Sequence, residues 1–285
     1  QIAYTAVNPV DWKIREGWLK KMMPHEFPLI PGWDAAGTIT AVGKEVRSFT
    51  VGDEVYAYCR KPTVQWGTYA EYVCFDAEHV ALKPKKFNFA QAAAIPLVGL
   101  TAWQSLFDAA KLQKGETVLI HAGAGGVGSL AIEFAKYAEA TVFTTASKKN
   151  HDYVKKLGAD FAIDYHAEDF VEALKAQEPN GVDVVFDCAG YETLDHSFDV
   201  VKTGGRLISI VNFIDQEKCE KYGIHGEFVL VRPDGEQLKK IAELIDQGIV
   251  TAPHIEEMPL TDFAKALEKN REGHTKGKIV LRVIQ

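Results

Sequence analysis

The stretch Thr117-Val-Leu-Ile-His-Ala-Gly-Ala-Gly-Gly-Val-Gly128 decides how this chain folds. Its first residues, Thr117 to His121, form a short apolar run that is typical of a buried strand. A glycine-rich turn follows, and an amphipathic helical pattern begins at Val127. In such a turn the backbone N–H groups can approach a pyrophosphate, and the helix N-terminus adds a partial positive charge. The context therefore predicts a dinucleotide-binding turn rather than a glycine-rich turn without a ligand. Its residues are Gly123, Ala124, Gly125, Gly126, Val127 and Gly128.

Strand and helix patterns alternate after this turn. One apolar helix face recurs at spacings of three and four residues between Val127 and Ala138. Alternating strands and helices imply parallel strands with helical crossovers, and hence a doubly wound α/β sheet. The expected strands beyond the first are Thr141 to Thr145, Phe161 to Tyr165, Val182 to Asp187, Arg206 to Val211 and Glu227 to Val231.

The residues before this region show a different sequence pattern, with short β-type runs separated by glycines and turns. Pro28 to Gly37 is predicted as a turn-rich segment, and a compact β-barrel-like unit is expected. Its strands are predicted at Ile2 to Val7, Thr38 to Val42, Glu54 to Tyr58 and Tyr69 to Cys74.

The chain end is predicted to form a helix over Glu236 to Gln247, a second short helix and a last strand over Lys278 to Val283. We expect this end to pack back on the N-terminal unit. The predicted domains are therefore residues 1–92, 93–232 and 233–285, with the last returning to the first.

Composition bounds the possible functions. The chain has 285 residues, of which 47% are hydrophobic and 25% are charged, so it can build a core. The formal net charge is −7, which disfavours general nucleic-acid binding. No apolar run approaches the roughly 20 residues that a membrane span needs. The four cysteines are scattered and form no Cys-x-x-Cys pair, which favours a reducing compartment, here taken as cytoplasmic.

The residues after the second parallel strand indicate which dinucleotide binds. NAD sites usually place a carboxylate there for the ribose 2′-hydroxyl. No Asp or Glu occurs between Ala140 and His151, and Ser147, Lys148 and Lys149 follow the strand instead. A hydroxyl and two ammonium groups attract a 2′-phosphate. The sequence thus favours NADP(H), the alternative being a solvated helix start.

Several motifs together resemble one known family, and they span essentially the whole chain. The turn AGAGGVG, the strand end Ser147-Lys-Lys149 and the run Gly158 to Tyr165 look like zinc-independent members of the medium-chain dehydrogenase/reductase family. The most similar group is the quinone oxidoreductases and enone reductases. Further matching segments are Asn8 to Lys13, Pro31 to Gly37, Val51 to Val55, Gly67 to Val73, Leu97 to Trp103 and Gly277 to Leu281.

This resemblance implies a GroES-like β-barrel catalytic domain, built from both ends of the chain, and a Rossmann domain between them. It also implies that about thirty residues, forming the first strands of the fold, precede Gln1. Tyr165 matches a tyrosine beside the 2′-phosphate, the alternative being a packed strand residue. Thr101, Asn212 and Val229 match positions beside the nicotinamide. Lys276 is expected near the cofactor phosphates, the alternative being a solvated tail lysine.

The same resemblance argues against zinc. Zinc-using relatives place Cys where Asn8 stands and His-Glu where Trp33-Asp34 stands. Neither Asn nor Trp is an ordinary zinc ligand, so zinc-dependent alcohol oxidation is disfavoured and no metal site is predicted. Asp34 is expected to serve the structure, with its carboxylate bonded to the backbone or to a neighbour.

Asn8 and Lys13 match positions that line the active cleft of the family, and they are the predicted catalytic residues. Either side chain can stabilise negative charge on an acceptor oxygen. The alternatives are a solvent-exposed lysine and a turn-forming asparagine before Pro9. The expected substrate is a small-molecule quinone or α,β-unsaturated carbonyl. A homodimer is expected, with no nucleic-acid or membrane partner. The competing hypothesis is a non-catalytic NADPH-binding protein.

Overall fold

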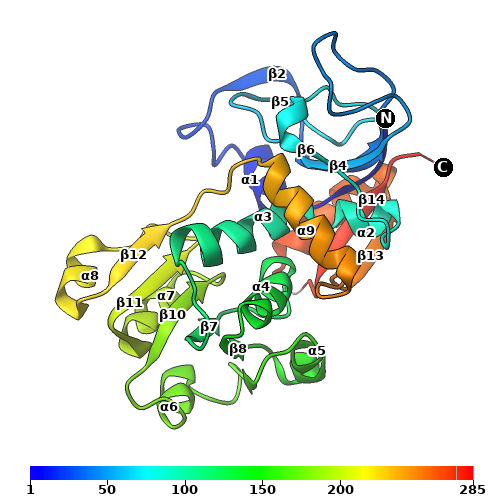
Figure 1. The fold of residues 1–285 in the computed structure, drawn as a ribbon. Helices are drawn as coiled ribbons and strands as arrows, with labels where there is room; N and C mark the ends of the chain where they lie inside the picture. Colours follow the sequence, from blue (N-terminus) through cyan, green and yellow to red (C-terminus); the bar gives the residue numbers. More distant parts are fainter. Residues whose placement is uncertain (274, 285) are drawn as a thin grey trace. The chain divides into compact units, whose positions relative to one another are not determined.

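The computed structural model describes residues 1–273 and 275–284. The chain divides into two compact units (Figure 1). Unit 1 contains residues 1–100 and 232–285, and unit 2 contains residues 101–231. Both ends of the chain therefore build unit 1. The first boundary lies at 100/101, inside helix α3 (Pro96–Trp103), rather than at the expected 92/93.

A six-stranded sheet forms the frame of unit 1. Its strand order is β13-β14-β1-β3-β4-β6, so the last strand of the chain lies beside the first. Thr5 pairs with Leu281 across the antiparallel β1–β14 ladder. The strands are β1 (Ile2–Ala6), β3 (Asp34–Thr38), β4 (Glu54–Tyr58), β6 (Val80–Leu82), β13 (Ile255–Pro259) and β14 (Lys278–Arg282).

The other elements of unit 1 lie around this sheet. Helix α9 packs against β6, and the Tyr56 hydroxyl donates to the carbonyl of Leu238 at 2.5 Å. A two-stranded sheet of β2 (His25–Ile30) and β5 (Val64–Trp66) stands apart from the main sheet. The helices are α1 (Pro9–Arg15), α2 (Phe89–Ala93), α9 (Gly235–Gln247) and α10 (Phe263–Arg271).

The segment Asp34-Ala-Ala-Gly-Thr38 forms strand β3, although its composition is typical of a turn. Ala, Gly and Asp are depleted in strands generally, so propensity argued against β3. Strand β3 lies between β1 and β4, and position 37 needs a glycine because the backbone of Gln1 comes very close to it. A Cβ atom on Gly37 would meet the Gln1 carbonyl oxygen at 1.9 Å. The prediction of a turn-rich Pro28 to Gly37 was therefore wrong over the end of β2 and most of β3.

Two further strand predictions in unit 1 were wrong. The run Thr38 to Val42 contributes only its first residue to β3. Tyr69 to Cys74 forms no ladder, because its backbone groups bond separately to different segments. The N–H of Tyr69 donates to the Pro31 carbonyl at 3.0 Å, whereas the Glu71 carbonyl accepts from Ile2 at 2.8 Å.

Unit 2 is a parallel sheet with strand order β12-β11-β10-β7-β8-β9. Every neighbouring pair is parallel, which confirms the predicted doubly wound fold. The order reverses between β7 and β10, and such a reversal is where open α/β sheets bind ligands. The strands are β7 (Thr117–Ile120), β8 (Thr141–Thr145), β9 (Phe161–Ile163), β10 (Val182–Asp187), β11 (Val201–Ser209) and β12 (His225–Phe228).

Alternation along these strands gives the sheet two buried faces. Leu119, Phe143, Val185 and Leu207 belong to one core cluster with residues of α6, α7 and α8. Val118, Val142 and Val184 project to the opposite face because side chains alternate along a strand, and α4 packs against β7 and β8. The helices are α4 (Gly126–Tyr137), α5 (His151–Lys156), α6 (Phe170–Lys175), α7 (Glu192–Ser197) and α8 (Gln216–Tyr222), and a π-helical segment spans Gln104–Ala109.

Among the residues that the structure describes, no helix has both the length and the apolar character needed to cross a membrane.

Candidate functional site

The glycine-rich turn connects the carboxyl end of β7 to the first residue of α4. Gly125 is the N-cap residue of α4, and no side chain caps this helix end. The first N–H groups of a helix have no acceptor within the helix, so this end offers free donors and a positive dipole. Ala122 holds the turn in a left-handed conformation with φ of 55°. The turn therefore has the donor set that a pyrophosphate requires.

Two glycines of the motif are required because other atoms come very close. A Cβ atom on Gly123 would lie 2.0 Å from Thr144 Oγ1. A Cβ atom on Gly128 would lie 2.4 Å from the Ala122 carbonyl oxygen and 2.7 Å from Gly123 Cα. Glycine at position 123 therefore lets the turn pack closely against β8. Glycine at position 128 lets the helix pack closely against the turn. These contacts match the glycine roles of a dinucleotide-binding turn, so the residues present fit a dinucleotide.

Ser147, Lys148 and Lys149 leave the sheet directly after β8, as the sequence predicted. Both lysines are exposed. The register of the β8–β9 ladder pairs Thr145 with Ile163, so Ser147 and Tyr165 leave the sheet at the same edge. The Tyr165 side chain is 50% exposed and does not pack within a strand. This edge therefore carries a hydroxyl, two ammonium groups and a phenol ring.

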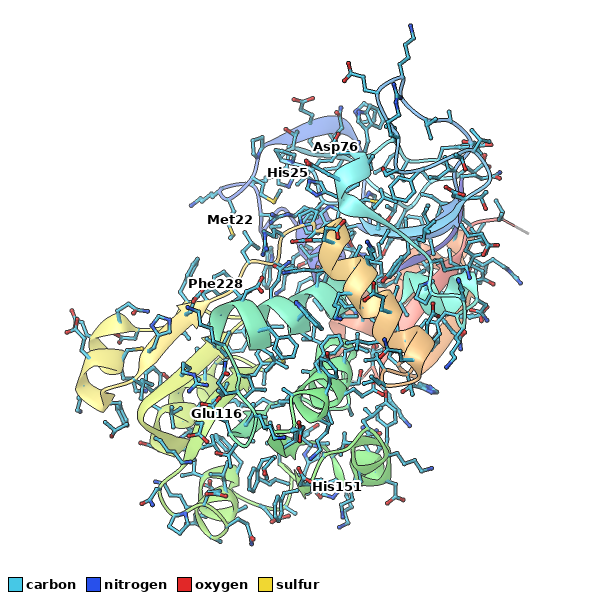
Figure 2. The ribbon with its side chains drawn as sticks, viewed as in Figure 1. Met22, His25, Asp76, Glu116, His151 and Phe228 are labelled. Carbon is cyan, nitrogen blue, oxygen red and sulfur yellow. The ribbon has the colours of Figure 1, made fainter. Side chains whose placement is uncertain are left out.

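The turn after β8 is tied back to the sheet. His151, at the start of α5, lies with ring Nε2 3.1 Å from the Ala146 carbonyl oxygen (Figure 2). The Asn150 amide donates to Ser147 Oγ at 3.2 Å. These bonds hold Ser147 in place, and they leave the lysine side chains in solvent.

A second polar cluster lies at the carboxyl ends of β10 and β11. Asp187 accepts from the N–H groups of Ala189 and Gly190, and from the Ser209 hydroxyl at 2.7 Å. Asn212 Oδ1 accepts from the N–H of Tyr191 at 3.0 Å. The Asn212 side chain thus braces the turn after β10.

The other residues predicted beside the cofactor fall in different places. Thr101 is buried in α3, and Val229 follows β12 with its N–H bonded to the Ser209 carbonyl at 2.9 Å. Lys276 belongs to unit 1, two residues before the buried Lys278. The structure therefore gathers the glycine-rich turn with the carboxyl ends of β8 to β12, and Lys276 lies in the other unit.

His121 and Cys188 each directly follow a strand of the parallel sheet, β7 and β10. His121 is fully buried, with ring nitrogens 3.2 Å from Thr145 Oγ1 and 3.0 Å from Ser197 Oγ. Burial lowers the pKa of His121 to about 4, although the charge of Asp187 opposes this shift. Burial also raises the pKa of the Cys188 thiol.

In unit 1, Asn8 lies in a buried polar network that sequence reasoning did not foresee. Its side-chain amide donates to Asp34 Oδ2 at 2.7 Å and its Oδ1 accepts from Lys278 Nζ at 2.5 Å. The Lys278 ammonium also donates to the Val7 carbonyl at 3.0 Å. Asn8 is only 1% exposed. Because Lys278 only donates and an ionised Asp34 only accepts, these two partners fix which way the amide points.

The structural role expected for Asp34 is confirmed. Its Oδ1 accepts from the backbone N–H of Leu97 at 2.7 Å, and its Oδ2 accepts from Asn8. Burial raises the pKa of Asp34, and Lys278 and these hydrogen bonds oppose the rise. Burial likewise lowers the pKa of Lys278, and the nearby carboxylates oppose that shift.

Asp11 is a second buried carboxyl group in the same region. Its Oδ2 accepts from the Asn8 N–H at 2.8 Å and from the Tyr69 hydroxyl at 3.0 Å. Within residues 1–273 and 275–284, its buried Oδ1 has no hydrogen-bond partner. Burial therefore raises the pKa of Asp11 to about 7.

Lys13 lies on α1, with its ammonium nitrogen 5.6 Å from the centre of the Trp12 ring. It is partly buried, and this burial lowers the pKa of Lys13. Lys13 is thus the more accessible of the two predicted catalytic residues. Asn8 contacts the interior, with one of its two amide hydrogens committed to Asp34.

The positions that carry zinc ligands in zinc-using relatives are built differently here. Trp33 is buried, and its ring packs edge-on against Tyr58 at 6.0 Å. The cation beside Asn8 is the ammonium group of Lys278. In the part of the chain that the structure describes, no group of three His, Cys, Asp or Glu side chains is arranged to hold a metal.

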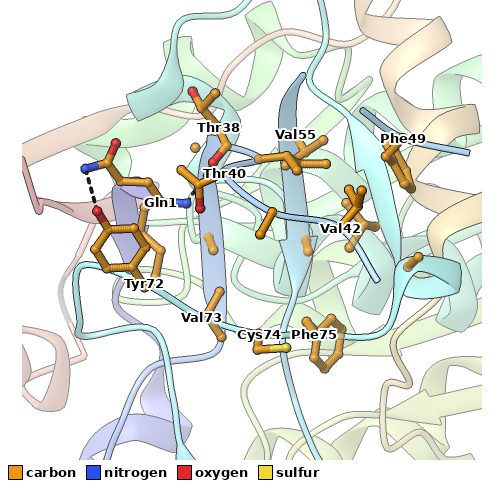
Figure 3. Close-up of a pocket in the computed structure, with 18 of the residues that line it drawn as sticks. Gln1, Thr38, Thr40, Val42, Phe49, Val55, Tyr72, Val73, Cys74 and Phe75 are labelled. Atoms are coloured by element: carbon orange, nitrogen blue, oxygen red, sulfur yellow. Dashed lines mark hydrogen bonds between the residues drawn. The ribbon is translucent and has the colours of Figure 1, made fainter. Parts of the chain in front are cut away.

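A cavity of about 410 Å³ in unit 1 lies elsewhere (Figure 3). Its lining includes Val42, Phe49, Tyr72 and Phe75, and it contains none of the predicted catalytic or cofactor-binding residues. It is therefore not part of the candidate site.

Comparison with known proteins agrees with this architecture. A family model described as an alcohol dehydrogenase GroES-like domain matches residues 1–85, and one described as a zinc-binding dehydrogenase matches residues 157–281. The chain is 36% identical over 290 residues to a chloroplastic NADPH-dependent alkenal/one oxidoreductase of Arabidopsis thaliana. That alignment covers 99% of this chain and 70% of the relative.

Solved structures show the same fold. The quinone oxidoreductase of Coxiella burnetii is 33% identical with a TM-score of 0.87, covering 99% of this chain and 89% of that one. The Escherichia coli quinone oxidoreductase, solved in complex with NADPH, is 28% identical with a TM-score of 0.88, covering 99% and 90%. Fold and turn together define a pyridine-nucleotide oxidoreductase architecture. The chain belongs to the medium-chain dehydrogenase/reductase family, as its motifs predicted.

Proposed function

We propose that this protein is an NADPH-dependent reductase that transfers a hydride to a quinone or an α,β-unsaturated carbonyl without zinc. The observation that carries the proposal is the glycine-lined turn at the uncapped start of α4, with Ser147, Lys148 and Lys149 after the next strand. The relatives include an alkenal/one oxidoreductase and quinone oxidoreductases, which supports this class of acceptor.

The choice of NADPH over NADH rests on charge at the end of β8. Two exposed ammonium groups and one hydroxyl stand where a carboxylate would repel a 2′-phosphate. The Tyr165 ring, at the end of the neighbouring strand, is the fourth proposed contact on that side. The Escherichia coli relative solved with NADPH supports the same choice.

The chain's own residues would have two tasks in the reaction. The turn from Gly123 to Gly128 would hold the diphosphate through backbone N–H groups, and Lys276 would contact the cofactor phosphates. Thr101, Asn212 and Val229 are the proposed contacts beside the nicotinamide. Bound NADPH supplies the hydride. Lys13 would stabilise negative charge on the acceptor oxygen, and Asn8 would contribute its uncommitted amide hydrogen.

Zinc independence is part of the proposal, and it rests on the donor set. Asn8 and Trp33 are poor zinc ligands. The remaining carboxylate, Asp34, already bonds Asn8 and the Leu97 backbone. We further propose a homodimer in the cytoplasm.

NADPH consumption with a panel of quinones and enones tests the function. We expect turnover with at least one acceptor and no zinc in the purified active protein. Tight NADPH binding without turnover on any acceptor would instead favour the alternative, a non-catalytic NADPH-binding protein. The 1% exposure of Asn8 is the observation that favours this alternative.

A charge reversal tests the choice of cofactor. Each exposed ammonium is worth about 1 kcal/mol against a phosphate charge at 4 Å in water. Reversing both charges in Lys148→Glu with Lys149→Glu should therefore weaken NADPH binding by about 4 kcal/mol, or nearly a thousandfold, and NADH binding far less. Equal losses for the two cofactors would reject the 2′-phosphate role. Lys155→Glu with Lys156→Glu, at the far end of α5, is the matched control.

A further inference from the structure

Two aromatic rings meet at the carboxyl ends of β11 and β12. The ring centres of Phe213 and Phe228 lie 4.5 Å apart, with the planes tilted by 47°. Phe213 is 75% exposed, and Leu230, two residues beyond Phe228, is 56% exposed. Large apolar groups of this kind, gathered at one edge of a sheet, mark a binding surface more often than scattered ones do.

The strand register places this pair at the ligand-binding edge of the sheet. Ser209, the last residue of β11, pairs with Phe228, the last residue of β12 (Figure 2 labels Phe228). Phe213 follows four residues later, beside Asn212. Ligands of open parallel sheets bind outside the carboxyl ends of the strands. The two rings therefore lie on the side of unit 2 that carries the glycine-rich turn.

The order of the strands also indicates which end of the dinucleotide lies over which half of the sheet. Folds of this kind consist of two mononucleotide-binding halves on either side of the strand reversal. Ser147, Lys148 and Lys149 follow β8, so the phosphorylated adenosine belongs to the half formed by β7, β8 and β9. The reactive half of the dinucleotide then belongs to β10, β11 and β12. The exposed rings are in that second half.

A second aromatic pair in the same sheet has a structural role and serves as a comparison. Phe143 and Phe161 also have ring centres 4.5 Å apart, on β8 and β9. There Phe143 is 1% exposed and belongs to the core, and Phe161 covers it. Phe213 is nearly twice as exposed as Phe161, at 75% against 39%, and neither it nor Phe228 belongs to that core cluster. Packing alone therefore does not account for Phe213.

We propose that Phe213 and Phe228 form a stacking platform for the ring of the acceptor, so that the reductase prefers flat aromatic quinones to short aliphatic enones. This inference rests on the proposed function and specifies its substrate class. Offset or tilted stacking on an aromatic ring suits a planar quinone, whereas a four-carbon enone has no ring to stack. The platform thus acts on acceptor binding and leaves the hydride transfer itself to other groups.

Phe213→Ala tests the platform in the intact protein with NADPH. The two acceptors are 1,4-naphthoquinone and but-3-en-2-one. We expect the KM for naphthoquinone to rise about tenfold, as the loss of one stacking contact predicts, with kcat nearly unchanged. The KM for butenone should stay within about twofold. Phe213→Tyr keeps the ring and should restore the naphthoquinone KM. Phe161→Ala, the matched change at the other aromatic pair, should leave both KM values unchanged.

Four results would overturn the inference. If Phe213→Ala leaves the naphthoquinone KM unchanged, the ring has no part in acceptor binding. If kcat/KM falls equally for both acceptors while analytical ultracentrifugation shows a smaller assembly, the rings form a contact between two copies of the chain. If the wild-type protein turns over butenone but not naphthoquinone, the preference is wrong although the proposed function stands. Absence of turnover with every acceptor would reject the proposed function itself, and the platform with it.

Discussion

The buried carboxyl group of Asp11 should make the stability of unit 1 depend on pH. Asp11 is fully buried, and its Oδ1 has no partner within the described part of the chain. Burial raises the pKa of Asp11 from 3.8 to about 7. Asp11→Asn keeps the shape of the side chain and the acceptor for Asn8 and Tyr69, but it removes the titration.

The sign and size of the effect follow from this shift. Between about pH 4 and pH 7 the unfolded chain has lost the Asp11 proton and the folded chain retains it. The free energy of unfolding therefore falls by about 1.4 kcal/mol for each unit that the pH rises. The stabilisation is complete below pH 3.8 and is lost as the pH passes about 7. Over this window, the wild-type protein should lose about 4 kcal/mol relative to Asp11→Asn.

Urea unfolding of both proteins between pH 4.5 and 8 measures this difference. Tryptophan fluorescence is a suitable probe because four of the five tryptophans, Trp12, Trp18, Trp33 and Trp66, lie in unit 1. Asp34 and Lys278 are present in both proteins, so the difference between the two curves reports Asp11 together with its electrostatic coupling to these two groups. Parallel curves across the whole range would refute the argument, since they would mean that Asp11 ionises in the folded protein as it does in the unfolded chain.

Three further changes test other parts of the molecule. Gly128→Ala places a Cβ atom 2.4 Å from the Ala122 carbonyl oxygen, so it should cost about 1 to 3 kcal/mol in thermal unfolding and sharply weaken NADPH binding; unchanged binding would contradict the close approach. Lys13→Ala should lower kcat by about tenfold to a hundredfold while the NADPH dissociation constant changes little, and an unaltered rate would place Lys13 outside the site. Asp183→Asn should show the opposite pH trend to Asp11. Burial acts to raise the pKa of Asp183, but bonds from Thr117 and Lys202 outweigh it, so the net pKa is lowered. The resulting cost of about 1 to 2 kcal/mol at pH 7, followed by circular dichroism, should shrink as the pH falls below about 4; a constant difference would contradict this.

The sequence predicted the sheet of unit 2 well because its signals are local. Strands β8 and β10 have the predicted bounds, and α4 begins one residue before the first residue of its apolar pattern. The predicted strand ends differ from the observed ones where pairing with a neighbouring strand, and not local composition, sets the end of a strand. Strand β11 begins at Val201, five residues before the predicted Arg206, and β12 spans His225–Phe228 rather than Glu227 to Val231.

The polar network of unit 1 could be predicted only in part. Asp34 was expected to be satisfied by backbone or a neighbour, and it is. Its partner Lys278 lies 244 residues away in sequence, and no local pattern links the two. The available signal was a lysine at the start of an otherwise apolar final strand, in a motif that matched the family. Sequence reasoning assigned Lys276, two residues earlier, to the cofactor phosphates and gave Lys278 no role.

The pairing of β14 with β1 has a consequence for how the chain is made. Strand β14 is an interior strand, held between β13 and β1, and its first residue neutralises a buried carboxylate. A ribosome makes residues 101–231 well before it reaches residue 278, so the parallel sheet can close early. Until residues 278–282 are translated, β1 has no β14 to pair with, and this edge of the N-terminal strands stays unpaired. During synthesis the chain therefore passes through a stage at which unit 2 can be folded while β1 of unit 1 still has an unpaired, aggregation-prone edge. A chaperone that binds this edge would protect the chain until β14 is made.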